Sequence, residues 1–392
     1  MLINHINNLV FFQYFVAIII WFFLFFLIER HLIRNFTINN SKYIFFLCYY
    51  VILSIAAIIR IFYPILPFTP DSLMYLKAAQ YIDVDNNFYF IGAFVYSSFI
   101  YLIKALTFNN YYSILFLNNF IFILALIELV KIIPNNNTKS IWVWYCFLLV
   151  YPSVYWFIPN ILREAIFFYF IVNVLTRSLE LLDSRVTINK LFLLILFCFF
   201  STLFRPQIFP IIFCWLVYVF FKRSFISGIV IFLFGVTLLF NDQIIAEYVS
   251  KVSFEYLEAK KTQGAHNVAS IAFKNLIIPK NIYELISLVP YLIFRFLFTP
   301  FPWELSNLKY FFATSDSFVL IILFSILFYN IIRKRLWNWD IVIFSFMFIS
   351  VLGIFEIAFS GAVRHRMPYI LILSVLIISL PKTRDHNIII NY

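Results

Sequence analysis

Long apolar runs separated by short polar turns follow one another along most of the chain. The runs lie at residues 9–29, 43–62, 113–133, 141–157, 161–178, 190–204, 207–222, 225–240, 316–332, 340–358 and 367–380. Most approach the roughly 20 apolar residues that an α-helix needs to cross a bilayer. The pattern therefore predicts an all-α polytopic membrane protein with about 11 transmembrane helices, in a single integral membrane domain that covers residues 1–392.

Composition indicates the same class of protein. Apolar residues make up 64% of the 392 residues, and charged residues make up 12%. Soluble domains are about 45–50% apolar and about 25% charged, so a soluble enzyme or a disordered chain is excluded. The net charge is +11, but many basic residues stand in short turns between apolar runs, where they orient helices. We therefore expect membrane lipids and no nucleic acid as partners.

The basic turns predict the orientation of the helices. They contain Arg30, Arg34, Lys42, Lys131, Lys139, Arg177, Arg185, Lys190, Lys222, Arg223, Arg333, Lys334, Arg335, Lys382 and Arg384. All of these turns are cytoplasmic if the apolar stretches 92–106 and 286–299 lie along the outer interface instead of crossing. This interpretation leaves two large outer loops, 63–112 and 241–315. The second loop has an amphipathic pattern over 243–263, typical of a helix on the membrane surface.

Acidic residues in the first outer loop are candidates for chemistry. Asp71 follows an apolar run and a proline turn, at the start of an expected helix. It is either a helix N-cap or a carboxylate that takes a proton from an acceptor hydroxyl. Asp83 and Asp85 form a D-x-D pair, which is either a divalent cation site or a solvated turn. No cofactor is certain, and the use of a metal stays open.

Two further outer turns carry charges next to apolar runs. Arg163 and Glu164 begin a run that enters the membrane, where ionisable groups are expensive and usually line a cavity or form pairs. Because they are adjacent, they cannot easily face the same direction on one helix, and each should have a different partner. Arg205 interrupts two runs before a proline. It is either a phosphate ligand or part of a tight structural turn.

The third basic cluster, Arg364-His365-Arg366, precedes the last apolar run on the expected outer side. Positive charge there opposes the usual bias and favours an anionic partner such as a lipid-linked phosphate. The alternative is attraction to anionic head groups without catalysis. Glu356 is an expected internal counter-charge.

The order of these motifs resembles the GT-C superfamily of membrane glycosyltransferases, which includes protein O-mannosyltransferases and lipid A aminoarabinose transferase. The resemblance covers about residues 43–210 and 340–380. Its motifs are Asp71-Ser72-x-x-Tyr75-x-x-x-Ala79, Asn118 and Asn119 within a spanning helix, a proline-rich turn that leads to Arg163-Glu164, and Arg364-x-Arg366-x-Pro368 before the last helix.

The resemblance implies an enzyme that moves a sugar from a polyprenyl-phosphate or polyprenyl-diphosphate carrier to an acceptor hydroxyl. Asp71 would be the general base, and Arg364 and Arg366 would hold the carrier phosphate. Arg163, Glu164 and Arg205 would line the cavity. The acceptor would be a glycan or glycolipid in cell-surface glycan synthesis. The chain lacks a second acidic residue close to Asp71, which many members have. We expect a bacterial inner (plasma) membrane protein with its site on the outer, periplasmic face.

Two other functions compete with this prediction. An O-antigen or capsular polysaccharide polymerase also has about a dozen helices, outer arginines and a large outer loop. The 241–315 segment favours a polymerase, and the early Asp71 loop favours a transferase. A lipid-linked sugar flippase or transporter predicts charges at mid-membrane and many helix breaks, but this chain has six glycines and nearly charge-free apolar runs.

Overall fold

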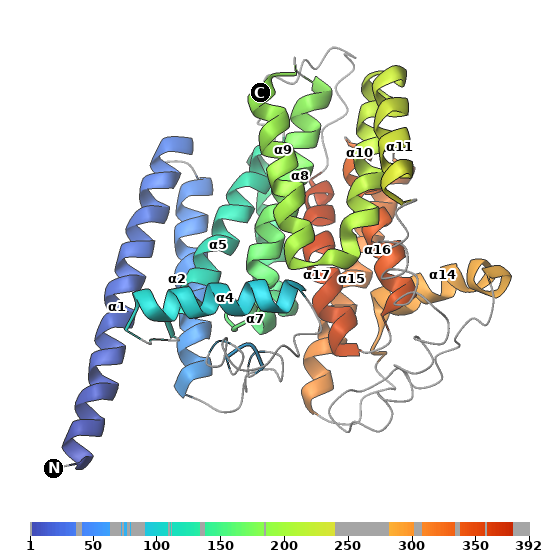
Figure 1. Cartoon of the computed structure of the whole chain (residues 1–392). Coiled ribbons are helices and arrows are strands. Elements are labelled where there is room, and N and C mark those ends of the chain that lie inside the picture. Colours follow the sequence, from blue (N-terminus) through green and yellow to red (C-terminus); the bar gives the residue numbers. More distant parts are fainter. Residues whose placement is uncertain are drawn as a thin grey trace. The chain divides into compact units, whose positions relative to one another are not determined.

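The protein is described by a computed structural model in which most of the chain is helical (Figure 1). The described residues are 2–36, 41–62, 72, 74–76, 79, 91–108, 110, 112–133, 138–183, 186–239, 282–301, 308–333, 338–356 and 359–378. No strand occurs among them. The fold over these ranges is therefore all-α, as the apolar pattern predicts.

The helices coincide with the apolar runs of the sequence. They are α1 (Leu2–Asn35), α2 (Ser41–Phe62), α4 (Ile91–Leu106), α5 (Tyr112–Lys131), α6 (Thr138–Val150), α7 (Pro152–Phe157), α8 (Glu164–Asp183), α9 (Ile188–Phe204), η1 (Pro206–Ile208), α10 (Phe209–Arg223), α11 (Phe225–Leu239), α14 (Ile282–Phe298), α15 (Leu308–Ile332), α16 (Trp339–Phe355), α17 (Phe359–Ser374) and η3 (Val375–Ile377).

Several of these helices are long and apolar enough to cross a membrane. In the described part of the chain there are five, at Phe12–Asn35, Ser41–Phe62, Tyr112–Lys131, Glu164–Leu182 and Ala313–Ile332. Other apolar helices are shorter, including those at 141–150, 188–204 and 339–353. The chain is thus a membrane protein with several spanning helices, and the expected count of about 11 crossings is not confirmed.

Two expected boundaries are wrong, and proline explains the first. The run at 141–157 is interrupted at Tyr151, between α6 and α7, because Pro152 has no N–H to donate and suits the first position of a new helix. The last helix was expected to begin at 367, after an outer turn at 359–366. Instead α17 begins at Phe359, so the Arg364-His365-Arg366 cluster is helical.

Packing of the backbone divides the chain into two compact units. Unit 1 comprises Met1–Ile132, Val154–Val174 and Phe192–Gln207. Unit 2 comprises Ile133–Ser153, Leu175–Leu191 and Ile208–Tyr392.

In unit 1, α5 is the central helix and contacts α1, α2 and α4. Its most apolar window is 78% buried, against 17% for α1, which presents most of its surface outward. α4 runs across the direction of α1, α2 and α5 (Figure 1). This orientation agrees with the interpretation that 92–106 does not cross the membrane.

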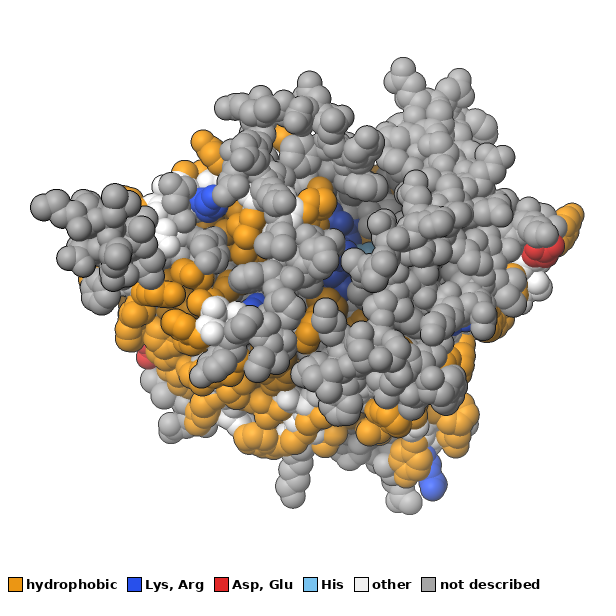
Figure 2. All heavy atoms as spheres, turned by 90° about the horizontal axis from the view of Figure 1, so that it is seen from below, with side chains coloured by type: hydrophobic (Ala, Val, Ile, Leu, Met, Phe, Trp, Pro, Cys, Tyr) orange, Lys and Arg blue, Asp and Glu red, His pale blue; other side chains and the backbone are white. Residues whose placement is uncertain are grey.

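Unit 2 is built around α16 and α17, which contact one another and α14. α15 packs on α14, α17 and η3, and α10 pairs with α11. α14 lies at a large angle to α16 in Figure 1, and the expectation that 286–299 stays at the interface remains a prediction. Hydrophobic side chains make up much of the described surface in Figure 2, which suits contact with lipid.

Candidate functional site

Asn160, in the turn between α7 and α8, is the centre of a buried polar network in unit 1. Its Oδ1 accepts hydrogen bonds from Ser72 Oγ and from Ile161 N, both at 2.8 Å. From α5, Asn118 Nδ2 donates to the carbonyl oxygens of Asn160 at 2.5 Å and Leu162 at 3.1 Å. The side chains of Ser72, Asn118 and Asn160 have no exposed surface. The network therefore holds the turn in one position against α5.

The described residues of the first-loop motif belong to the same network. Besides Ser72, Tyr75 packs edge-to-face on Tyr96 of α4 with ring centroids 5.0 Å apart, and Ala79 is buried. The Tyr96 hydroxyl lies 3.4 Å from Asn118 Nδ2. The motif thus packs against α4, α5 and the α7–α8 turn. The predicted base Asp71, the Asp83–Asp85 pair and the amphipathic segment 243–263 lie outside the described residues.

Arg163 and Glu164 have different partners, as their adjacency predicts. Arg163 Nη1 donates to the carbonyl oxygen of Phe204 at 2.8 Å, whereas Glu164 Oε1 accepts from Arg205 Nη2 at 2.6 Å. Glu164 is the first residue of α8, where a carboxylate also interacts favourably with the helix dipole. Both interactions tie the start of α8 to the end of α9.

The side chains of Arg205 and Arg163 differ in their exposure to the surface. The side chains of Arg205 and Glu164 are 0% and 1% exposed, and the Arg205 guanidinium also lies 4.5 Å from the centre of the Phe167 ring. The two charges of such a buried pair neutralise each other and serve the structure, because removing one partner leaves an uncompensated buried charge. Arg163 is half-buried and keeps partial access to the surface. Of the two, Arg163 is therefore better placed to meet a ligand.

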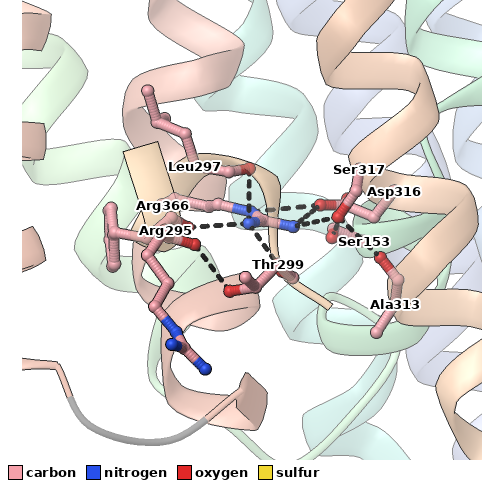
Figure 3. Close-up of polar contacts among 9 residues, drawn as sticks. Ser153, Arg295, Leu297, Thr299, Ala313, Asp316, Ser317 and Arg366 are labelled. Atoms are coloured by element: carbon pink, nitrogen blue, oxygen red, sulfur yellow. Dashed lines mark hydrogen bonds and ion pairs between the residues drawn. The ribbon is translucent and has the colours of Figure 1, made fainter. Parts of the chain in front are cut away.

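In unit 2, Arg366 is the centre of a second buried network (Figure 3). Its Nη2 and Nε lie 2.5 and 3.2 Å from Asp316 Oδ2, and the side chains of the pair are 0% and 1% exposed. Asp316 also accepts a hydrogen bond from Ser153 Oγ. This network joins α17, α15 and the first turn of α7.

Arg366 also caps the end of α14. Its Nη1 donates to the carbonyl oxygens of Phe296, Leu297 and Thr299 at 2.7, 2.6 and 3.1 Å. The last carbonyl groups of a helix have no N–H donor within the helix, and the helix dipole stabilises a cation placed beside them. Figure 3 shows the Arg295 side chain pointing away from the Arg366 guanidinium. The contacts of Arg366 thus indicate a structural role and do not support the expected role as a phosphate ligand.

His365 and Arg364 occupy a different environment from Arg366. His365 Nδ1 lies 2.6 Å from Glu356 Oε2, and the two side chains are 16% and 10% exposed. His365 Nε2 lies 3.3 Å from Arg364 Nη2. Glu356 is therefore a counter-charge of the cluster, as predicted, and its partner is His365.

The expected cluster of three cations does not form a single patch, because successive helical residues point about 100° apart. Arg366 faces the buried network, and Arg364 and His365 are half-buried. Sequence reasoning missed Asp316, although a carboxylate within an apolar run is itself a signal of a paired or functional group. It also missed Asn160 as the centre of its network.

No protein-family model, curated protein or solved structure matches this chain. Among the described residues, no three His, Cys, Asp or Glu side chains gather as a metal site would require. Unit 2 has an apolar cavity of about 580 Å³, lined by phenylalanines such as Phe298 and Phe324, but none of the predicted site residues lines it.

Proposed function

We propose that this chain is a membrane glycosyltransferase that moves a sugar from a polyprenyl-phosphate or polyprenyl-diphosphate carrier to an acceptor hydroxyl on the outer face. The observation that supports it most is the hydrogen bond from Ser72 Oγ to Asn160 Oδ1. This bond ties the first-loop motif to the turn that carries Arg163 and Glu164. Motif residues that are about 90 positions apart in sequence thereby meet in one unit, as a shared site requires.

Within this proposal, Asp71 is the general base. It is covalently joined to Ser72, and Ser72 is held by the Asn160 network. A carboxylate in hydrogen-bond reach of an acceptor hydroxyl raises the nucleophilicity of its oxygen. The acceptor oxygen attacks the anomeric carbon of the sugar, and Asp71 takes the hydroxyl proton. The carrier phosphate leaves with the electron pair of the broken C–O bond.

Negative charge grows on the departing phosphate, and a positioned cation stabilises it. In unit 1 that cation is Arg163, which is half-buried, while Arg205 neutralises Glu164 and holds the start of α8. Asn160 and Ser72 act as positioning residues for the loop.

The test compares a strain that lacks the protein with strains restored by variants, using mass-resolved profiles of surface glycans and lipid-linked sugars. Asp71→Asn keeps the capping ability of the residue, since Asn caps helices as well as Asp does, but removes the base. We expect it to fail to restore the missing sugar. The matched control is Asp83→Asn in the same loop, which we expect to restore it. Ser72→Ala should restore it only in part.

Other outcomes decide between the competing functions. Collapse of a polymer ladder to a single repeat would replace the proposal with a polysaccharide polymerase. An unchanged surface profile in the deletion strain would contradict any transfer function. Full restoration by Asp71→Asn, at equal protein abundance, would make Asp71 a helix cap and not a base.

A further inference from the structure

In unit 2, the hydrogen bonds of His365 with Glu356 and Arg364 depend on whether the His365 imidazole is protonated. We propose that Arg364 and His365 form a phosphate-binding site that becomes competent when His365 takes up a proton. The ligand class is a phosphate ester, and identifying it with the phosphate of the lipid carrier rests on the proposed function.

The distances define which nitrogen of His365 carries hydrogen in the observed arrangement. Glu356 Oε2 is an acceptor 2.6 Å from Nδ1, so Nδ1 donates. Arg364 can only donate, so Nε2, 3.3 Å from its Nη2, accepts and carries no hydrogen. The arrangement therefore belongs to a neutral imidazole. In this state one N–H group of the Arg364 guanidinium donates to His365 Nε2.

Protonation of His365 reverses this relation. Nε2–H and the Arg364 N–H groups are then donors that face each other, so their hydrogen bond is lost and their charges repel. A single anion placed between them accepts from both. A phosphate oxygen fits, because phosphate esters accept several charge-assisted hydrogen bonds and Arg matches their geometry. The partial exposure of His365, at 16%, leaves an approach for such a ligand.

Glu356 stabilises the protonated state, and the backbone gives it room to do so. Glu356 ends α16 in an extended conformation, and its carboxylate lies over Gly361 in the first turn of α17. A Cβ built on Gly361 would lie 2.6 Å from Glu356 Cδ, closer than real contacts allow. A side chain at position 361 would therefore displace the Glu356 carboxylate from this position. Gly361 is thus a positioning residue for a pair that it does not itself contact by hydrogen bonds.

Other charged groups on the elements packed against α17 have different partners. On α15, Asp316 pairs with Arg366, and on α14, Arg295 donates to the Tyr291 hydroxyl at 2.6 Å. Asp340 of α16 pairs with Lys222 at the other end of that helix. Glu356 and Arg364 both lie within hydrogen-bonding distance of the His365 ring nitrogens.

The experiment measures binding by the full chain, purified in dodecyl maltoside, of a fluorescent methyl farnesyl phosphate. This diester keeps one negative charge across the pH range, so any pH dependence comes from the protein. We expect binding about tenfold tighter at pH 6 than at pH 8, because histidine is the side chain whose charge ordinarily changes between these pH values. His365→Gln should bind weakly at both pH values.

Variants of the supporting residues separate this site from a general loss of structure. Glu356→Gln removes the carboxylate that favours the imidazolium, and Gly361→Ala displaces it, so both variants should move the midpoint of binding to lower pH. The matched control is Gly353→Ala, whose Cβ would lie 3.3 Å from Phe296 Cβ in the α14–α16 contact. It should change stability without moving the midpoint.

A competition experiment shows whether the phosphate group or the farnesyl chain is recognised. Competition by dimethyl phosphate would identify the phosphate group as the recognised element, whereas no competition at a hundredfold excess would overturn phosphate recognition and leave binding to the farnesyl chain. Equal binding at pH 6 and pH 8, or an unshifted midpoint in Glu356→Gln, would also overturn the proposal. The assay involves no sugar transfer, so its failure leaves the transferase proposal standing.

Discussion

The buried pair Arg366–Asp316 supports a quantitative prediction about the stability of unit 2. Replacing Arg366 by Met keeps a long apolar side chain but removes every donor of the guanidinium. Asp316, 1% exposed in its side chain, would lose the cation at 2.5 Å, although it would keep the hydrogen bond from Ser153 Oγ. The three carbonyls at the end of α14 would lose their donor as well.

The expected cost follows from these losses. Breaking a buried ion pair by removing one partner typically costs about 3–5 kcal/mol, because the remaining charge is buried without compensation. The unpaired carbonyls add to this cost. We therefore expect Arg366→Met to lower the free energy of unfolding by at least about 3 kcal/mol. Removing both charges, in Asp316→Leu with Arg366→Met, should recover at least about 1.4 kcal/mol, or tenfold in the folding equilibrium.

The measurement is unfolding of the purified chain by guanidinium in detergent, followed by tryptophan fluorescence. Trp144 and Trp215 are fully buried in unit 2 and report its unfolding. Native chain, both single variants and the double variant form a double-mutant cycle. The reasoning is refuted if Arg366→Met costs less than about 1 kcal/mol, or if the double variant loses the sum of the two single losses.

The remaining predictions concern individual contacts and use the same unfolding assay. Glu164→Gln should cost about 3 kcal/mol, because it leaves Arg205 buried without its counter-charge; a cost below about 1 kcal/mol would contradict this. Asn118→Leu removes two hydrogen bonds to buried carbonyls and should cost about 2–4 kcal/mol, and a stable variant would show that those carbonyls find other donors. Lys222→Gln, by contrast, should change stability by less than about 1 kcal/mol, because Lys222 is 47% exposed beside Asp340.

The class of protein and the positions of most helices follow from the sequence because they depend on local properties. A run of about 20 apolar residues forms a helix in a membrane wherever it occurs in the fold, since the backbone must satisfy its own hydrogen bonds there. For this reason the apolar runs coincide with helices, and the break at Pro152 is itself a local effect. The different partners of Arg163 and Glu164 were predictable for the same reason, from helical geometry alone.

The partners of the charged residues were decided by the tertiary structure. Sequence reasoning grouped Arg364, His365 and Arg366 because they are adjacent, but α17 continues through them and points them in different directions. Arg366 then meets Asp316, which is 50 positions away in the sequence, and ends in a structural network. Local sequence contains no record of which distant helix a side chain faces. Burial and pairing are properties of the packed helices. Only the packing shows that Arg366 and Arg205 are buried and paired. It also shows that Arg163, Arg364 and His365 are partly exposed.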